Sequence, residues 1–140
     1  MAGNWIFSTV TVPGQEVPLQ LAALPATTTT VLENGKKLAP YLVIYCQRGA
    51  ARPINAFLDM RMPMALTGTA IVKINGKEST PFALTPLQPG DASRISLPHE
   101  LTPLLREAVQ LEFLLPGHTA HFLLLHWPEI RERLERSCKQ

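Results

Sequence analysis

The sequence predicts a mainly β fold, with sandwich-like antiparallel sheets, one short helix and an amphipathic C-terminal helix. Three observations lead to this prediction. Apolar and β-branched residues fill the segment 41–46, an Asn-Gly dipeptide separates two strand-like segments at residues 75–76, and apolar residues recur at helical spacing from residue 127 onward. With 140 residues, of which 46% are hydrophobic and 17% charged, the chain fits a single β-rich domain over residues 1–140.

Two strands and a loop are expected in the N-terminal third of the chain. Residues 5–12 are rich in aromatic and β-branched side chains, and the Pro13-Gly14 turn signal follows them. Residues 16–23 predict a second strand. The stretch 24–40 contains two prolines, four consecutive threonines and an Asn-Gly pair, so it favours a long loop or an edge ribbon.

The segment 41–46 predicts the clearest strand. Its side chains alternate between two apolar faces, and we expect both faces to be covered. One face carries Leu42, Ile44 and Cys46, and the other carries Tyr41, Val43 and Tyr45. Residues 53–60 predict a further strand, which the methionine-rich run 60–64 ends. Those methionines either fill the edge of the core or form an adaptable binding surface.

A β-hairpin is expected around Asn75-Gly76. This dipeptide separates residues 69–74 from residues 77–84 and suits a type I′ turn, whose two central residues need positive φ. Pro81 lies in the return strand and favours an edge position, because proline cannot donate a hydrogen bond to a neighbouring strand.

A short helix and a second hairpin follow. Leucines at helical spacing predict the helix over residues 97–107, with Pro98 near its start. Apolar side chains then alternate over residues 109–115, and Pro116-Gly117 turns the chain into a return strand over residues 118–125.

The C-terminal segment predicts an amphipathic helix. Pro128 suits its first turn, and the apolar stripe consists of Trp127, Ile130, Leu134 and Cys138. Oppositely charged residues four positions apart favour ion pairs on its exposed faces: Glu129–Arg133, Glu132–Arg136 and Glu135–Lys139. The stripe should therefore pack on the sheet.

Composition makes several function classes poor candidates. The formal net charge is only +2, and the 13 basic residues are interspersed with 11 acidic ones, which argues against nucleic-acid binding. No segment approaches the roughly 18 consecutive apolar residues of a membrane span. The sequence predicts a protein partner and leaves the binding residues and the oligomeric state open.

No motif indicates catalysis, a metal or a cofactor. Nucleophile elbows, glycine-rich phosphate loops and paired helical histidine ligands are absent from the sequence. Asp59 and Asp91 adjoin turn or breaker residues, where solvation or local backbone bonding is the usual role. His118, His121 and His126 are not expected to converge, since strand faces alternate. We therefore expect a non-enzymatic protein without a cofactor.

The two cysteines are the most informative residues. Cys46 shares a face with Leu42 and Ile44, while Cys138 ends the apolar stripe of the C-terminal helix, so both should point into one core. A disulfide between them would close a loop of about 90 residues and contribute on the order of 4 kcal/mol. Two buried free thiols fit the same pattern equally well. The residues alone leave both alternatives open.

The order of features along the chain resembles a known family. A tryptophan-bearing first strand with Trp5, an apolar strand ending in Cys46, the strand and turn of residues 71–76, and the strand and helix of residues 122–138 occur in this order. The pattern is similar to the small exported proteobacterial proteins of the VasI type, which are accessories of type VI secretion, and to their uncharacterised phage and bacterial relatives. The resemblance implies a periplasmic β-sandwich-like domain without catalytic activity, and it favours the structural disulfide between Cys46 and Cys138.

These observations predict a non-catalytic, exported accessory or protein-binding module, at the cell envelope or associated with a secretion system. The alternative is a small inhibitor or immunity-type protein that blocks an enzyme. A phage gene is one source from which such a protein would come. Residues 1–5 show no basic region followed by an apolar run, so the sequence holds no signal peptide. We expect either a periplasmic protein whose leader is absent from this chain or a cytoplasmic one.

Overall fold

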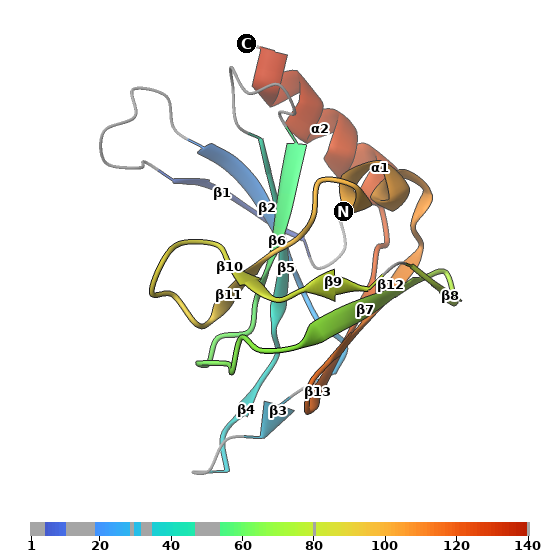
Figure 1. The fold of residues 1–140 in the computed structure, drawn as a ribbon. Helices are drawn as coiled ribbons and strands as arrows, with labels where there is room; N and C mark the ends of the chain where they lie inside the picture. The colour runs from blue at the N-terminus through green and yellow to red at the C-terminus, as the bar shows by residue number, and fades with distance from the viewer. Residues whose placement is uncertain are drawn as a thin grey trace.

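The computed structural model confirms a mainly β fold, with 48% of the residues in strands and 15% in helices. It describes residues 5–10, 19–28, 30–31, 35–46, 54–79 and 81–139. The strands form two antiparallel sheets and a small ribbon, and the longest helix lies at the C-terminal end of the chain (Figure 1).

The first sheet has six strands. Their spatial order is β1 (Ile6–Val10), β2 (Leu19–Pro25), β5 (Tyr41–Cys46), β6 (Ile54–Asp59), β11 (Arg94–Ser96) and β10 (Thr85–Pro86). Predicted and observed bounds agree for β5 and differ by one to three residues for the described parts of β1, β2 and β6. The sequence did not predict β10 and β11. Residues 11–12 and 16–18, which the sequence assigns to strands, lie outside the described residues.

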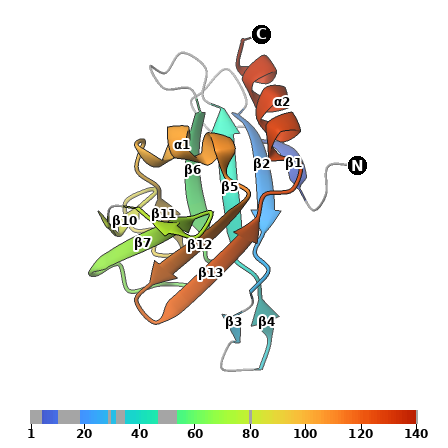
Figure 2. The ribbon, with the colours of Figure 1, turned by 90° about the vertical axis from the view of Figure 1, so that its right-hand side faces the viewer.

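The second sheet is built from the two predicted hairpins. Its order is β13 (His118–Leu123), β12 (Gln110–Leu115), β7 (Thr69–Ile74) and β8 (Lys77–Glu78), and β9 (Phe82–Ala83) also pairs with β7. The return strand expected over residues 77–84 is thus divided in two, with Pro81 between the pieces. It lies at the sheet edge, as predicted. The ribbon of β3 (Thr30–Val31) and β4 (Lys37–Leu38) projects from the lower end in Figures 1 and 2.

The Asn75-Gly76 turn has the geometry that the sequence predicts. Asn75 has φ of 52° and Gly76 has φ of 87°, the positive values of a type I′ turn. The Asn75 side chain also fastens the turn to the neighbouring strand. Its Oδ1 accepts hydrogen bonds from the backbone N–H of Val109 at 2.8 Å and of Gln110 at 3.1 Å, and its Nδ2 donates to the Glu107 carbonyl at 3.2 Å.

The chain connects the two sheets at both ends of the second sheet. Between β9 and β10 it leaves the second sheet and joins the first within residues 83–85. At the opposite edge, the segment after β2 lies against β13: the Thr27 N–H donates to the His121 carbonyl at 2.7 Å, and the Thr28 hydroxyl donates to the Thr119 carbonyl at 3.4 Å. The outer edge of β13 therefore has partners from the first sheet.

Strand register determines which face of the six-stranded sheet is inside. Ala22 pairs with Phe7 and Ile44, and Ile44 pairs with Ala56, so these side chains share one face. This inner face contributes Leu24, Leu42, Leu58 and Ile95 to the core, which meets Val72, Leu111, Phe113, Ala120 and Phe122 of the second sheet. Figure 2 shows the second sheet in front of β5 and β6. The core lies between the sheets.

Helix α2 (Trp127–Lys139) covers the rest of the inner face. As predicted, Trp127, Ile130 and Leu134 are buried, at 2% exposure or less. Trp127 stacks on Trp5 with ring centroids 5.5 Å apart. Both indole N–H groups are satisfied: Trp5 donates to the Leu125 carbonyl at 2.8 Å, and Trp127 donates to the Leu105 carbonyl at 2.7 Å. The first strand and the last helix are thereby joined.

The short helix and the predicted ion pairs of α2 differ from the sequence prediction. Helix α1 spans only Leu101–Leu104 and continues as a 3-10 turn over Leu105–Glu107, so the expected helix over residues 97–107 starts later. Val109, predicted as a strand residue facing inward, precedes β12 and is 62% exposed.

The charged side chains of α2 contact residues other than those that the sequence pattern indicates. Arg133 lies over the Phe7 ring, 3.8 Å from its centroid, while Glu129 approaches His126 and Glu135 pairs with Arg131. Arg133 contacts the first strand and Glu129 a histidine before the helix, whereas Glu135 keeps a four-residue spacing but pairs with Arg131. The side chain of Lys139, its predicted partner, lies outside the described residues.

Candidate protein-binding surface

The histidines and aspartates that the sequence singled out make local contacts with neighbouring residues. His121 contacts the Thr27 hydroxyl at 2.6 Å and Gln110 at 3.3 Å, whereas His126 approaches only Glu129, at 3.8 Å. His118 begins β13, and its side chain is half-buried. Within the described ranges, no group of three or more His, Cys, Asp or Glu side chains could hold a metal ion.

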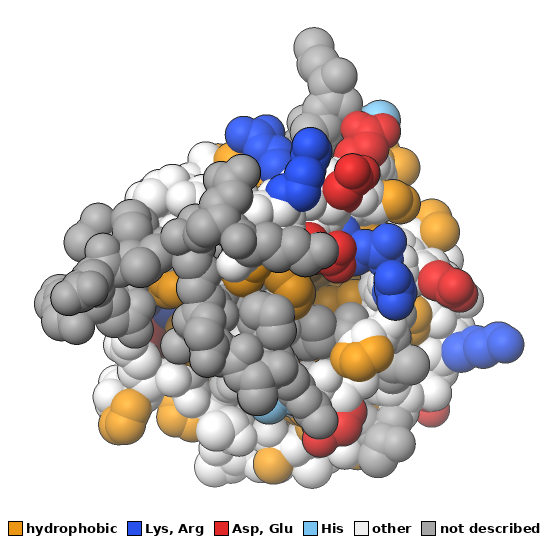
Figure 3. All heavy atoms as spheres, turned by 90° about the horizontal axis from the view of Figure 1, so that it is seen from above, with side chains coloured by type: hydrophobic (Ala, Val, Ile, Leu, Met, Phe, Trp, Pro, Cys, Tyr) orange, Lys and Arg blue, Asp and Glu red, His pale blue; other side chains and the backbone are white. Residues whose placement is uncertain are grey.

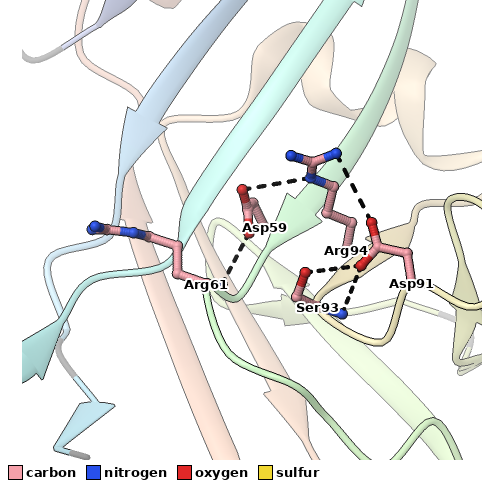
Figure 4. A network of polar contacts seen from close by, with 5 residues as sticks. All are labelled: Asp59, Arg61, Asp91, Ser93 and Arg94. Atoms are coloured by element: carbon pink, nitrogen blue, oxygen red, sulfur yellow. Dashed lines mark hydrogen bonds and ion pairs between the residues drawn. The ribbon is translucent and has the colours of Figure 1, made fainter.

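The two aspartates bind local backbone groups, as the sequence predicts. Asp59 accepts a hydrogen bond from the Arg61 N–H at 2.9 Å, and Asp91 accepts from the N–H of Ser93 at 3.0 Å and from its hydroxyl at 2.8 Å (Figure 4). Arg94 lies between the two carboxylates, 3.8 Å from Asp59 and 3.9 Å from Asp91. The Ser93 backbone hydrogen bond, followed by its hydroxyl, lowers the pKa of Asp91. This network fastens the loop before β11 to the end of β6.

The other face of the six-stranded sheet carries a group of apolar side chains outside the core, bordered in register by Asn55 beside Tyr45 and by Asp59 beside Tyr41. Register places Ala23 beside Val43 and Phe57, and Leu21 beside Tyr45. We call these five residues (Leu21, Ala23, Val43, Tyr45 and Phe57) the outer patch. None of them belongs to the core cluster, whose members from this sheet all lie on the inner face. The expectation that both faces of β5 are covered therefore holds for the inner face, while Tyr41 and Tyr45 on the outer face remain half-exposed.

The outer face of the second sheet is polar at its centre. A polar row crosses it, where Glu112 pairs in register with Lys73 and His121, and the Lys73 Nζ lies 3.9 Å from the Glu112 carboxylate. An antiparallel sheet with one wet face normally alternates in this way. The outer face of the six-stranded sheet also has a charged pair, Asp59 and Arg94, in register beside Tyr41, but the five residues of the outer patch are uncharged.

Aromatic contacts order the outer patch. The rings of Tyr45 and Phe57 are 5.8 Å apart and tilted by 58°, a favourable edge-on arrangement. Val43 is only 6% exposed. Burial raises the pKa of the Tyr45 hydroxyl, so this side chain stays neutral at physiological pH. At one end of the face the Arg61 guanidinium lies 5.1 Å from the Tyr41 ring centroid. The surface is thus a preformed apolar platform with a cation at its rim.

The two cysteines meet between β5 and α2. Cys46 and Cys138 form a disulfide pair with Cα atoms 5.7 Å apart, within the usual range for disulfides. The predicted proximity of these side chains is confirmed. The pair closes 92 residues of sequence separation and ties the last turn of α2 to a central strand on the face opposite the outer patch.

The remaining candidate features are structural or dispersed. Met60 and Met64 are buried in the core at 2% and 9% exposure, and Met62 packs against it, so the methionine run fills the core edge. Lys and Arg side chains are interspersed with Asp and Glu on the face shown in Figure 3. Among the helices described, none has the length and apolarity needed to cross a membrane.

The outer patch is the feature that sequence reasoning missed. The signal was present in the Tyr41-Val43-Tyr45 alternation, but an apolar second face in a strand is also what a fully buried strand shows. Only the register of the three neighbouring strands β2, β5 and β6 distinguishes the two. No protein-family model, no curated protein and no solved structure matches this chain significantly.

Proposed function

We propose that this chain is a non-catalytic, exported protein-binding module that acts at the cell envelope or with a secretion system. The outer patch carries the proposal. Its half-exposed aromatic and aliphatic side chains lie on a rigid sheet, and aromatic residues supply large contact area at a low ordering cost. Four of its five side chains are partly buried and Val43 is buried, and apolar surface that stays partly accessible outside the core is a feature of interaction sites.

Two observations support export. Disulfides persist mainly in oxidising compartments, and both cysteines of the chain are paired with each other. The order of sequence features that resembles VasI-type secretion accessories supports the link to secretion.

The proposal is tested by site-specific photo-crosslinking in the cells that make the protein. A photoreactive phenylalanine derivative replaces Tyr45 in the outer patch, and a matched control carries it at Leu123, which is 41% exposed on the second sheet. We expect adducts from position 45 to contain an envelope or secretion protein, and adducts from position 123 not to contain it.

The same experiment separates the proposal from its alternative. A single stoichiometric enzyme in the position-45 adduct would identify a small inhibitor or immunity-type protein instead of an accessory. Equal yields at both positions, or no adduct at position 45, would contradict the outer patch as the binding surface. If position 45 captures a partner, we expect Tyr45→Lys to abolish binding of that partner and Leu123→Lys to leave it unchanged.

A further inference from the structure

The edges of the two sheets are protected very unequally. The edge strand β10 has two residues, one of them Pro86, and the edge strand β8 consists of the exposed pair Lys77–Glu78. The edge of β13 is contacted by Thr27 and Thr28. Short strands, proline, exposed charge and covering segments are the devices that prevent a sheet edge from pairing with another chain.

Within the described ranges, strand β1 shows none of these devices. It is five residues long, and its sequence Ile-Phe-Ser-Thr-Val contains neither proline nor a charged residue. It pairs with β2 through five consecutive residues without a bulge. In the described part of the chain, β2 is its only strand partner. Ile6 is 51% and Val10 is 41% exposed. In the part of the chain that the structure describes, the outer side of this strand is unpaired, and three of its five side chains are apolar.

We propose that β1 pairs antiparallel with β1 of a second copy of this chain, forming a twofold dimer in which two six-stranded sheets become continuous. The inference goes beyond the proposed function and does not rest on it. A twofold axis at Ser8 places Ile6 of one copy beside Val10 of the other on the outer face. On the inner face it places Phe7 beside Thr9.

Charge and side-chain type favour a second copy as the occupant of this edge. All five side chains of β1 are uncharged, so self-pairing brings no like charges directly opposite each other, and β-branched residues meet as cross-strand pairs. Arg133 is held over Phe7 within each copy and would face the uncharged Thr9 of the other. Twofold pairing of identical patches is also the commonest form of oligomer.

The dimer would bring two outer patches together. Ile6 lies on the same face as Ala23 and pairs with it in register, so the patch extends to the very edge of the sheet. Joining two edges would make one continuous apolar face from both copies. The Cys46–Cys138 pair and α2 lie on the opposite face, where Arg133 of α2 covers Phe7 of the same copy.

The proposal is tested by measuring the molar mass of the protein in solution, by sedimentation or light scattering over a concentration series. We expect the wild type to approach twice the 15.5 kDa chain mass. Ser8→Lys places two lysines opposite each other at the twofold axis and should raise the dimer dissociation constant roughly fivefold or more. Ser8→Glu should do the same, and an equimolar mixture of the two variants should regain the dimer.

Controls distinguish a lost interface from a lost fold. Val109→Lys alters a side chain that is 62% exposed and far from β1 in sequence, and it should leave the dimer intact. Far-UV circular dichroism should show all variants folded, and Val10→Lys serves as a second edge variant. A wild type that is monomeric at every concentration, as expected if β1 instead receives a strand from another protein, would overturn the proposal. So would a Ser8→Lys variant that dimerises like the wild type, or a mixture that stays monomeric.

Discussion

At the scale of single residues, Asn75 stabilises the hairpin through both its backbone and its side chain. Its positive φ closes the type I′ turn, and its side chain makes three hydrogen bonds to the segment entering β12. We expect Asn75→Gly to lose about 1–2 kcal/mol of folding free energy, since exposed hydrogen bonds contribute at the low end of their range. Asn75→Ala should lose more, because alanine adds strain at positive φ. Urea titration of both variants measures the difference, and equal losses would mean that the backbone strain is negligible.

Asp91 links stability to pH. Its pKa is lowered in the folded protein, chiefly by the Ser93 backbone hydrogen bond, so its contribution is present above the ordinary carboxyl pKa and is lost as pH falls through the lowered folded value. We expect Asp91→Ala to be less stable than the wild type at neutral pH. That difference should shrink in acid as the wild-type carboxylate takes up its proton. Thermal melts of both proteins across acid pH measure it, and a difference that stays constant would place its cause outside the carboxylate.

At the scale of elements, α2 depends on its buried stripe and much less on its charges. Leu134 is 1% exposed, so Leu134→Ala should cost roughly 2–5 kcal/mol as a large-to-small core change. Arg136→Ala, on the exposed side of the same helix, should cost far less. Arg133→Ala should fall between them, because it removes a cation–π contact with Phe7 worth about 0.5–1 kcal/mol at an exposed site. A denaturant titration in which Leu134→Ala and Arg136→Ala lose equal stability would show that the buried face is assigned wrongly.

At the scale of the whole molecule, the Cys46–Cys138 pair joins the last helical turn to a central strand. We expect the functional protein to contain this bond, which contributes on the order of 4 kcal/mol by restricting the unfolded chain. Mass measurement without reductant should give a chain lighter by two hydrogens. Cys138→Ser should melt at a lower temperature under oxidising conditions and match the wild type in reductant. Two thiols that alkylate freely in native, oxidised protein would contradict the bond and remove the main support for export.

The sequence by itself determined the features that rest on local chemistry. The Asn75-Gly76 turn, the strand 41–46, the buried stripe of α2 and the local bonding of Asp59 and Asp91 each follow from a few neighbouring residues, because φ preferences, side-chain alternation and helical spacing act over short distances.

Only the tertiary structure decided what depends on neighbouring strands. The outer patch exists because the register of β2, β5 and β6 aligns their apolar side chains on the face away from the core, and alternation within one strand cannot say which of two apolar faces is inside. The open edge of β1 depends on which strands end up at the borders of each sheet. Arg133 leaves its predicted partner on α2 because folding brings Phe7 beneath it. Contacts between residues far apart in sequence carry all three features, so the order of residues alone does not reveal them.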